Sequence, residues 1–234
     1  MVPWWHRREF FQALAIPLFV FGGLMQIWRY TWDRMPAWAN WLFWLAYGIG
    51  FVWCVVTCHR LVLVGTTSTW LGLVPKWSWR ETRFYLWLIA IVLICAGTGI
   101  FLSTVCLSAL ANFMKGEEEF WAGWIQFAVR IPVIYLFARF SLIYPATAID
   151  RKVNLKWAWR QTKGNGWRLA FVITFLPWAL SRGVNLLYRE QATAAEILIL
   201  VAIGCVLMVI DVAALSLSYR ELADVEDSAS APSN

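Results

Sequence analysis

The sequence predicts an all-α integral membrane protein, with six transmembrane helices arranged as three hairpins of the same orientation. Hydrophobic residues make up 61% of the 234 residues and charged residues only 15%, whereas a soluble domain is about half apolar and about one quarter charged. The mean hydropathy is +0.60. The 18 tryptophans point the same way, because the indole ring favours the membrane–water interface. These figures exclude a soluble domain and a disordered chain.

Six stretches are apolar enough to cross a hydrocarbon core, which takes about 20 residues of helix. The first follows His6, Arg7 and Arg8 as in a signal peptide, but it is long and no small-residue cleavage site ends it. We therefore expect it to stay as a membrane helix. In chain order the six spans cover residues 10–28, 38–58, 84–110, 121–143, 167–187 and 197–217.

Three of these spans contain a proline, at Pro17, Pro132 and Pro177. Proline lacks a backbone N–H, so each is expected to kink its helix and leave backbone carbonyls free locally. Such kinks open cavities in some membrane proteins and are also common in membrane helices generally.

The distribution of positive charge predicts the orientation. Of the 20 Lys and Arg residues, fourteen fall on the side of both termini, five fall on the other side, and Arg130 lies within a span. Loops that stay in the cytoplasm carry such an excess, so both termini are expected to be cytoplasmic. Residues 223–234 are small, polar and acidic, and we expect them to form a disordered tail behind a single transmembrane domain over residues 1–222.

An internal repeat divides this domain. Residues 2–9 and 74–81 share the frame V-P-x-W-x-x-R-E, and K-W-A-W-R-Q-T-K at 156–163 matches K-W-S-W-R-E-T-R at 76–83. Since each unit begins and ends on the same side, the repeats are parallel and related by an axis along the membrane normal. The units cover about residues 1–65, 66–145 and 146–222, and each opens with a cytoplasmic amphipathic segment.

The opening segments also carry helix-start signals. Ser78 followed by Glu81 is a capping-box pattern, so a helix is expected to begin there. Asn154 is suited to cap the equivalent helix in the third unit, and Gly164 to end it before the next span.

These segments mix tryptophan with lysine or arginine, which suits a helix lying in the headgroup plane. Two interpretations remain open: the cations are positive-inside anchors only, or they form a dedicated site for anionic lipid. The second predicts headgroup contacts by Lys76, Trp77, Arg80, Lys156, Trp157 and Arg160.

Arg130 and Asp211 are the ionisable residues within spans. Each lies nine residues before a span-closing arginine, Arg139 or Arg220, which places both near the middle of the membrane. Because charge is costly there, we expect the two side chains to pair across the fourth and sixth helices, with two separate cavity-facing groups as the alternative.

The remaining motifs give no catalytic or metal site. Cys54, Cys58 and His59 invite a metal interpretation, but Ala46 and Gly50 continue the same helical line as a small-residue packing stripe. None of the common hydrolase, zinc-protease or phosphate-loop motifs is present. We therefore expect no enzyme activity and no cofactor.

Between residues 139 and 169 the chain has Arg139 at the end of a span, then Pro145, Asp150-Arg151, the amphipathic stretch 157–163 and T-K-G-N-x-W. In these elements it resembles part of bacterial six-helix inner-membrane proteins related to the membrane domain of glycerophosphodiester phosphodiesterases, and allied uncharacterised families. The ending S-L-S-Y-R-E-L at 216–222 is similar too. The resemblance implies a bacterial inner-membrane module with a phospholipid or envelope function and without the soluble hydrolytic domain.

The sequence thus predicts a non-catalytic membrane protein whose basic, Trp-rich cytoplasmic face engages anionic phospholipid headgroups, a membrane-protein partner or a second copy of the chain. No nucleic-acid partner is expected. The alternative is a transporter or permease-like protein with a mid-membrane cavity near Arg130 and Asp211.

Overall fold

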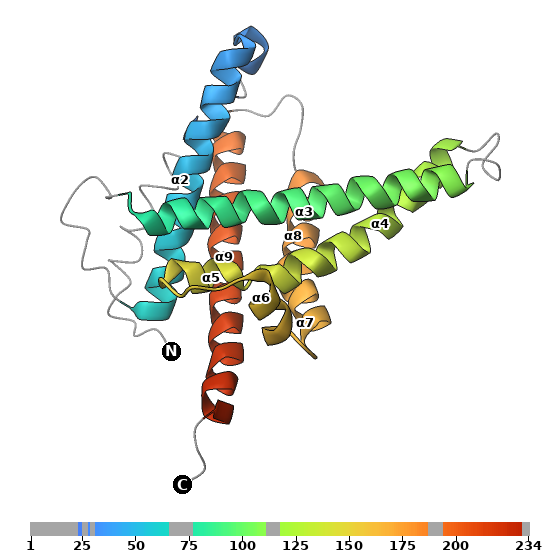
Figure 1. The fold of residues 1–234 in the computed structure, drawn as a ribbon. Helices are drawn as coiled ribbons and strands as arrows, with labels where there is room; N and C mark the ends of the chain where they lie inside the picture. Colours follow the sequence, from blue (N-terminus) through green and yellow to red (C-terminus); the bar gives the residue numbers. More distant parts are fainter. Residues whose placement is uncertain are drawn as a thin grey trace.

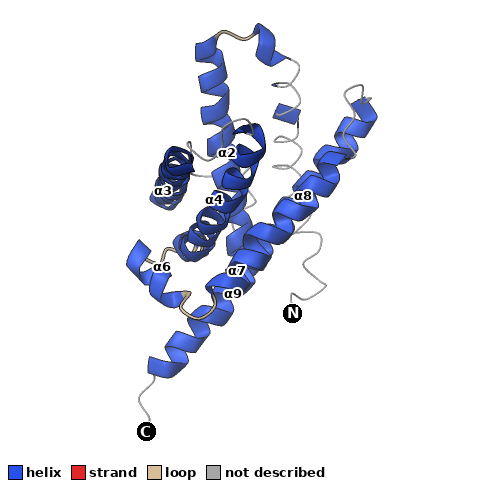
Figure 2. Ribbon diagram, turned by 90° about the vertical axis from the view of Figure 1, so that its right-hand side faces the viewer, coloured by secondary structure: helices blue, strands red, loops and turns tan. Residues whose placement is uncertain are grey.

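The computed structural model describes residues 23, 24, 28, 31–65, 77–110, 118–186 and 194–230. All regular elements in these ranges are helices, which confirms the all-α class (Figures 1 and 2). In chain order they are η2 (Trp32–Arg34), α2 (Ala37–Val64), α3 (Trp79–Leu110), α4 (Glu118–Phe140), α5 (Ile143–Ala148), α6 (Leu155–Gln161), α7 (Gly166–Ala170), the π-helix η3 (Phe171–Phe175), α8 (Leu176–Leu186) and α9 (Ala194–Ser230).

Within the described ranges, four helical segments are long and apolar enough to cross a membrane. They coincide with the second, third, fourth and sixth predicted spans. The first predicted span, 10–28, lies almost entirely outside the described residues, and the threefold repeat stays a prediction. The four segments are Ala37–Val64, Trp79–Ala109, Phe120–Ala148 and Ala202–Ala223.

The fifth predicted span, 167–187, is not one regular α-helix. The π-helix η3 separates α7 from α8 directly before Pro177. Pro177 cannot donate a backbone hydrogen bond, and its ring would clash with the carbonyl four residues earlier, so the wider π-turn accommodates it. Pro132, by contrast, lies inside a continuous α4.

The predicted helix-start signals of α3 and α6 are confirmed. The Ser78 backbone N–H donates to Glu81 Oε2 at 2.8 Å, as in a capping box. The Trp157 backbone N–H donates to Asn154 Oδ1 at 2.8 Å. Gly164, with a φ of +83°, lies in the turn after α6. Because α3 begins at Trp79, the amphipathic segment of the second unit is continuous with the span that follows, whereas that of the third unit is the separate helix α6.

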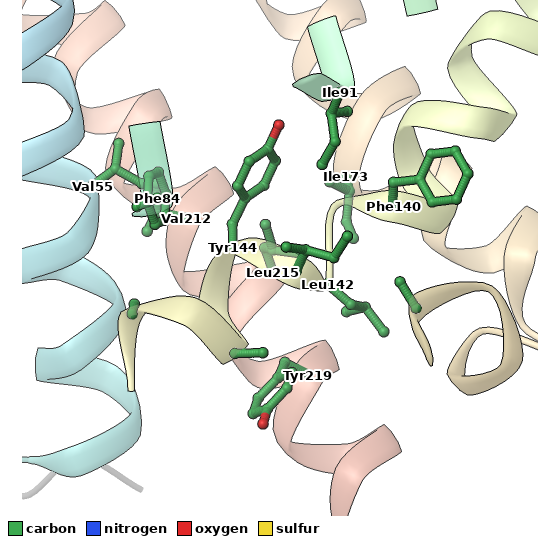
Figure 3. Packing of buried hydrophobic residues seen from close by; sticks show 14 of the residues in the cluster. Val55, Phe84, Ile91, Phe140, Leu142, Tyr144, Ile173, Val212, Leu215 and Tyr219 are labelled. Carbon is green, nitrogen blue, oxygen red and sulfur yellow. The ribbon is translucent and has the colours of Figure 1, made fainter. Parts of the chain in front are cut away.

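The hydrophobic core is built around α5, all six residues of which are buried. Helices α2, α3 and α9 pack on it, so these three long helices are joined through one short helix. Figure 3 shows Leu142 and Tyr144 among side chains from α3 and α9. The largest fully buried side chains of this region include Val52, Val56, Phe84, Ile91, Leu142 and Ile143.

The long helices of the described ranges do not all run in one direction. Helices α2, α8 and α9 run in one general direction in Figure 1, and the α3–α4 hairpin runs across them; in Figure 2, α3 is seen almost end-on and α9 along its length. Buried contacts gather around α5, whereas the outer halves of the long helices expose large apolar side chains, such as Trp41 (76% exposed) and Ile100 (68% exposed). The elements are therefore fastened to one another mainly at one end.

The predicted disordered tail is helical over most of its length, because α9 continues to Ser230. Two local features favour this extension. Ala223 is buried, and Gln161 Nε2 donates to the Leu222 carbonyl oxygen at 2.7 Å, which ties this part of α9 to α6. The remaining residues, 231–234, lie outside the described ranges.

Candidate functional site

The helix ends that carry much of the positive charge meet around α5. The C-terminal end of α2 and the first turns of α3 come together on the left of Figure 1, where both pack on α5 close to the turn between α5 and α6. Because α5 packs on α2, α3 and α9 at once, the core itself fixes the spacing of these basic ends.

One acidic residue, Asp150, lies among three arginines at this meeting point. Its Oδ1 is 3.1 Å from Arg80 Nε and 3.7 Å from Arg83 Nη2, and its Oδ2 is 3.7 Å from Arg60 Nη1. Arg60 Nη1 also donates to the Ala148 carbonyl oxygen at 3.3 Å. We call Arg60, Arg80, Arg83 and Asp150 the basic junction. It links α2, α3 and the α5–α6 turn by charge.

The backbone at Asp150 is left-handed, with a φ of +66°. Aspartate is among the few non-glycine residues enriched in this conformation. The turn thereby presents a half-exposed carboxylate toward α2 and α3.

A second arginine-rich contact fixes α6 and α7 on α4. The buried Arg139 guanidinium lies over the Trp159 ring, with its carbon 4.0 Å from the ring centroid. Its Nη1 donates to the Tyr135 hydroxyl at 2.8 Å, and its Nη2 donates to the Trp159 carbonyl oxygen. The Tyr135 ring also packs against Trp167, with 4.8 Å between centroids. This cation–π and hydrogen-bond contact holds α6 in one orientation.

That orientation exposes a basic, aromatic surface. Ala158, Thr162, Leu169 and Ala170 are buried against the rest of the protein. The exposed residues of the same two helices and of the turn between them include four cations and two tryptophans. We call this surface the α6–α7 face; it comprises Lys156, Trp159, Arg160, Lys163, Trp167 and Arg168.

The predicted headgroup contacts divide into four groups. Lys156 and Arg160 are exposed on the α6–α7 face, and Lys76 lies outside the described residues. Arg80 is directed to Asp150. The remaining two are tryptophans held by neighbouring side chains: Trp77 Nε1 donates to Thr82 Oγ1 at 2.8 Å, and Trp157 lies under Arg151 and near Tyr219.

The structure does not bring Arg130 and Asp211 together: among the described residues, no ion pair joins them. Helix α4 packs on α3, α6, α7 and η3, whereas α9 packs on α2, α5, α8 and η3. The two residues lie on helices that are not close neighbours. The predicted intramembrane pair is therefore not formed in this structure. The transporter alternative had placed its cavity near these two residues.

His59 has a structural partner. Its Nδ1 is 2.7 Å from Ser216 Oγ, and the Ser216 hydroxyl donates to the Val212 carbonyl oxygen at 2.8 Å. A hydroxyl has a single proton, so His59 Nδ1 carries the proton of their shared hydrogen bond. The contact fastens α2 to α9 inside the core. Cys54 and Cys58 lie nearby in α2, but the described residues contain no group of three or more His, Cys, Asp or Glu that could hold a metal ion.

Sequence reasoning missed Asp150, Arg60 and Arg83 as a group, and Arg139 as a buried contact. Two signals for them exist in the chain. Asp150 is an isolated acidic residue in a strongly basic stretch, and Arg60 and Arg139 close spans at equivalent positions of the predicted repeat.

Comparison of the chain with protein-family models, curated proteins and solved structures finds no match. The resemblance of residues 139–169 to a bacterial membrane module therefore stays a prediction.

Proposed function

We propose that this protein is a non-catalytic module of the bacterial inner membrane that engages anionic phospholipid headgroups through the α6–α7 face, with both termini in the cytoplasm. One observation carries the proposal: four exposed cations and two exposed tryptophans lie in one short segment, residues 156–168, that is anchored to the protein by buried residues. Tryptophan favours the headgroup level, and each cation near an anionic leaflet contributes on the order of 1 kcal/mol.

The geometry suits headgroups better than a solvated surface. Trp159 and Trp167 are 43% and 64% exposed beside the cations, and large apolar side chains in contact with water are costly. Arg139 holds Trp159 in place, so the surface is ordered before any lipid binds. The four helical segments that are long and apolar enough to cross a membrane would hold this face at the membrane surface.

Charge reversal tests the proposal. We expect Lys156→Glu combined with Arg160→Glu to lower phosphatidylglycerol retention about tenfold or more, because two attractive charges become repulsive. The full chain is extracted from nanodiscs of phosphatidylglycerol and phosphatidylcholine, and native mass spectrometry counts the lipids that remain bound.

The matched control reverses two exposed cations predicted to lie on the opposite side of the membrane, Arg34→Glu with Arg182→Glu. We expect this variant to retain phosphatidylglycerol as the unchanged chain does. Equal retention by the Lys156/Arg160 variant and the unchanged chain would refute the proposal. If that variant instead loses only a bound protein or a second copy of the chain, the face is a protein-binding surface.

A further inference from the structure

The basic junction has more donors than its carboxylate can accept. Each guanidinium carries five N–H groups, whereas one carboxylate accepts about four hydrogen bonds. Only Arg80 Nε, at 3.1 Å, is within hydrogen-bond distance of Asp150; Arg60 and Arg83 are at 3.7 Å, an ion-pair distance. The three arginines are therefore attracted to one carboxylate, which cannot accept hydrogen bonds from all of their N–H groups.

The other contacts of the basic junction do not use up the surplus of arginine N–H donors. Arg60 makes one further hydrogen bond, to the Ala148 carbonyl, and the buried Arg83 Nε has no hydrogen-bond partner among the described residues. Glu81 is the acidic residue between Arg80 and Arg83 in the chain, but its Oε2 accepts from the backbone and hydroxyl of Ser78. N–H groups of these arginines are thus available to donate to an anion with more acceptor oxygens than a carboxylate.

We propose that Arg60, Arg80 and Arg83 bind a phosphate group, and that the Asp150 carboxylate occupies the position of the anion when no phosphate is bound. Phosphate offers more acceptor oxygens than a carboxylate, and guanidinium groups bind it in forked pairs. The Asp150 side chain is 54% exposed, so it can turn outward into solvent when displaced. The arginines stay partly accessible, with 21–33% of each side chain exposed.

Two sources can supply this phosphate: a lipid headgroup or a soluble phosphate. The junction lies at the C-terminal end of α2 and the N-terminal end of α3, and the end of an apolar helix that crosses the membrane lies at the depth of lipid phosphates. The inference rests on the proposed function only for the lipid source, because a soluble phosphate needs no membrane contact.

Calorimetric titration of the full chain in neutral detergent with inorganic phosphate, against chloride at equal ionic strength, tests the soluble source. We expect Asp150→Asn to tighten phosphate binding about fivefold, because it removes the competing charge. Arg80→Gln should weaken binding about tenfold. The matched control is Glu221→Gln, which removes an exposed carboxylate of α9 and should change nothing.

Native mass spectrometry from nanodiscs of phosphatidic acid and phosphatidylcholine tests the lipid source with the same variants. Tighter binding by Asp150→Asn in either arm supports the site and identifies the source. Unchanged or weaker binding in both arms would overturn it. If Asp150→Asn does not fold, Arg83→Gln provides the test. If that variant binds phosphate and phosphatidic acid as tightly as the unchanged chain, the proposed site is also overturned.

The lipid-binding face and the phosphate site at the basic junction can be tested independently of each other. The Lys156→Glu and Arg160→Glu changes leave Arg60, Arg80 and Arg83 intact, so this variant should bind phosphate at the junction as tightly as the unchanged chain. Loss of junction binding in this variant would contradict a discrete arginine site, whatever its effect on phosphatidylglycerol retention.

Discussion

Replacing Phe84 by alanine is expected to lower the free energy of unfolding by about 3–5 kcal/mol. Phe84 is 1% exposed near the start of α3, and its ring centroid lies 5.2 Å from that of Tyr144 and 6.0 Å from that of His59. Alanine would leave a cavity where three elements meet, and their backbones are held by α5 and cannot collapse into it (Figure 3). SDS-induced unfolding in mixed micelles measures the loss.

Phe101 in the same helix gives a matched control. It is 66% exposed, so Phe101→Ala removes few protein contacts and should change the free energy of unfolding by no more than about 0.5 kcal/mol. Equal losses for the two variants would show that α3 is held along its whole length rather than through its first turns.

The difference between these two phenylalanines could not be predicted from the sequence. Both lie in the same apolar span, and lipid tails are as apolar as a protein core, so hydropathy does not tell a lipid-facing side chain from a buried one. The same ambiguity hid α5. Ile143 ended a predicted span, whereas the structure begins a separate, fully buried helix there.

Features set by local chemistry were predicted well. A helix that crosses a membrane needs a fixed length of apolar residues, so the spans containing α2 and α3 follow from hydropathy alone. Likewise, a cap depends on residues three positions apart, as at Ser78 and Glu81 or at Asn154 and Trp157.

Contacts between distant residues were not predictable in this way. Arg130 and Asp211 were paired because each lies nine residues before a span-closing arginine. That spacing gives depth along a helix and does not say which helices touch. Asp150 shows the converse, since its partners Arg60 and Arg80 are 90 and 70 residues away and are brought to it only by the packing of α5.

Replacing Gly166 by alanine is expected to lower the free energy of unfolding by about 2–3 kcal/mol, by overpacking the contact between α7 and α4. A Cβ at this position would lie 2.8 Å from the Tyr135 ring and hydroxyl and 2.9 Å from Arg139 Cδ. Neither side chain can withdraw easily, because Arg139 donates to Tyr135 and to the Trp159 carbonyl. SDS-induced unfolding measures the loss, and hydrogen exchange over residues 155–170 should show faster exchange in α6 and α7.

The control for this change is Gly97→Ala in α3. A Cβ at Gly97 meets no atom within 4 Å, so alanine should be neutral or stabilise the helix by up to about 1 kcal/mol. A loss at Gly97 as large as at Gly166 would mean that the cost comes from the helix backbone and not from Tyr135 and Arg139.

Gly166→Ala also separates two ways in which the α6–α7 face could hold lipid. The variant keeps every cation of the face but disturbs Arg139, which fixes Trp159 beside Lys156 and Arg160. If ordered placement matters, phosphatidylglycerol retention should fall although the charge is unchanged, because lipid binding must then also order the face. Full retention would show that charge alone attracts the headgroups. The close approach of α7 to α4, which only glycine permits, would then serve stability and not recognition.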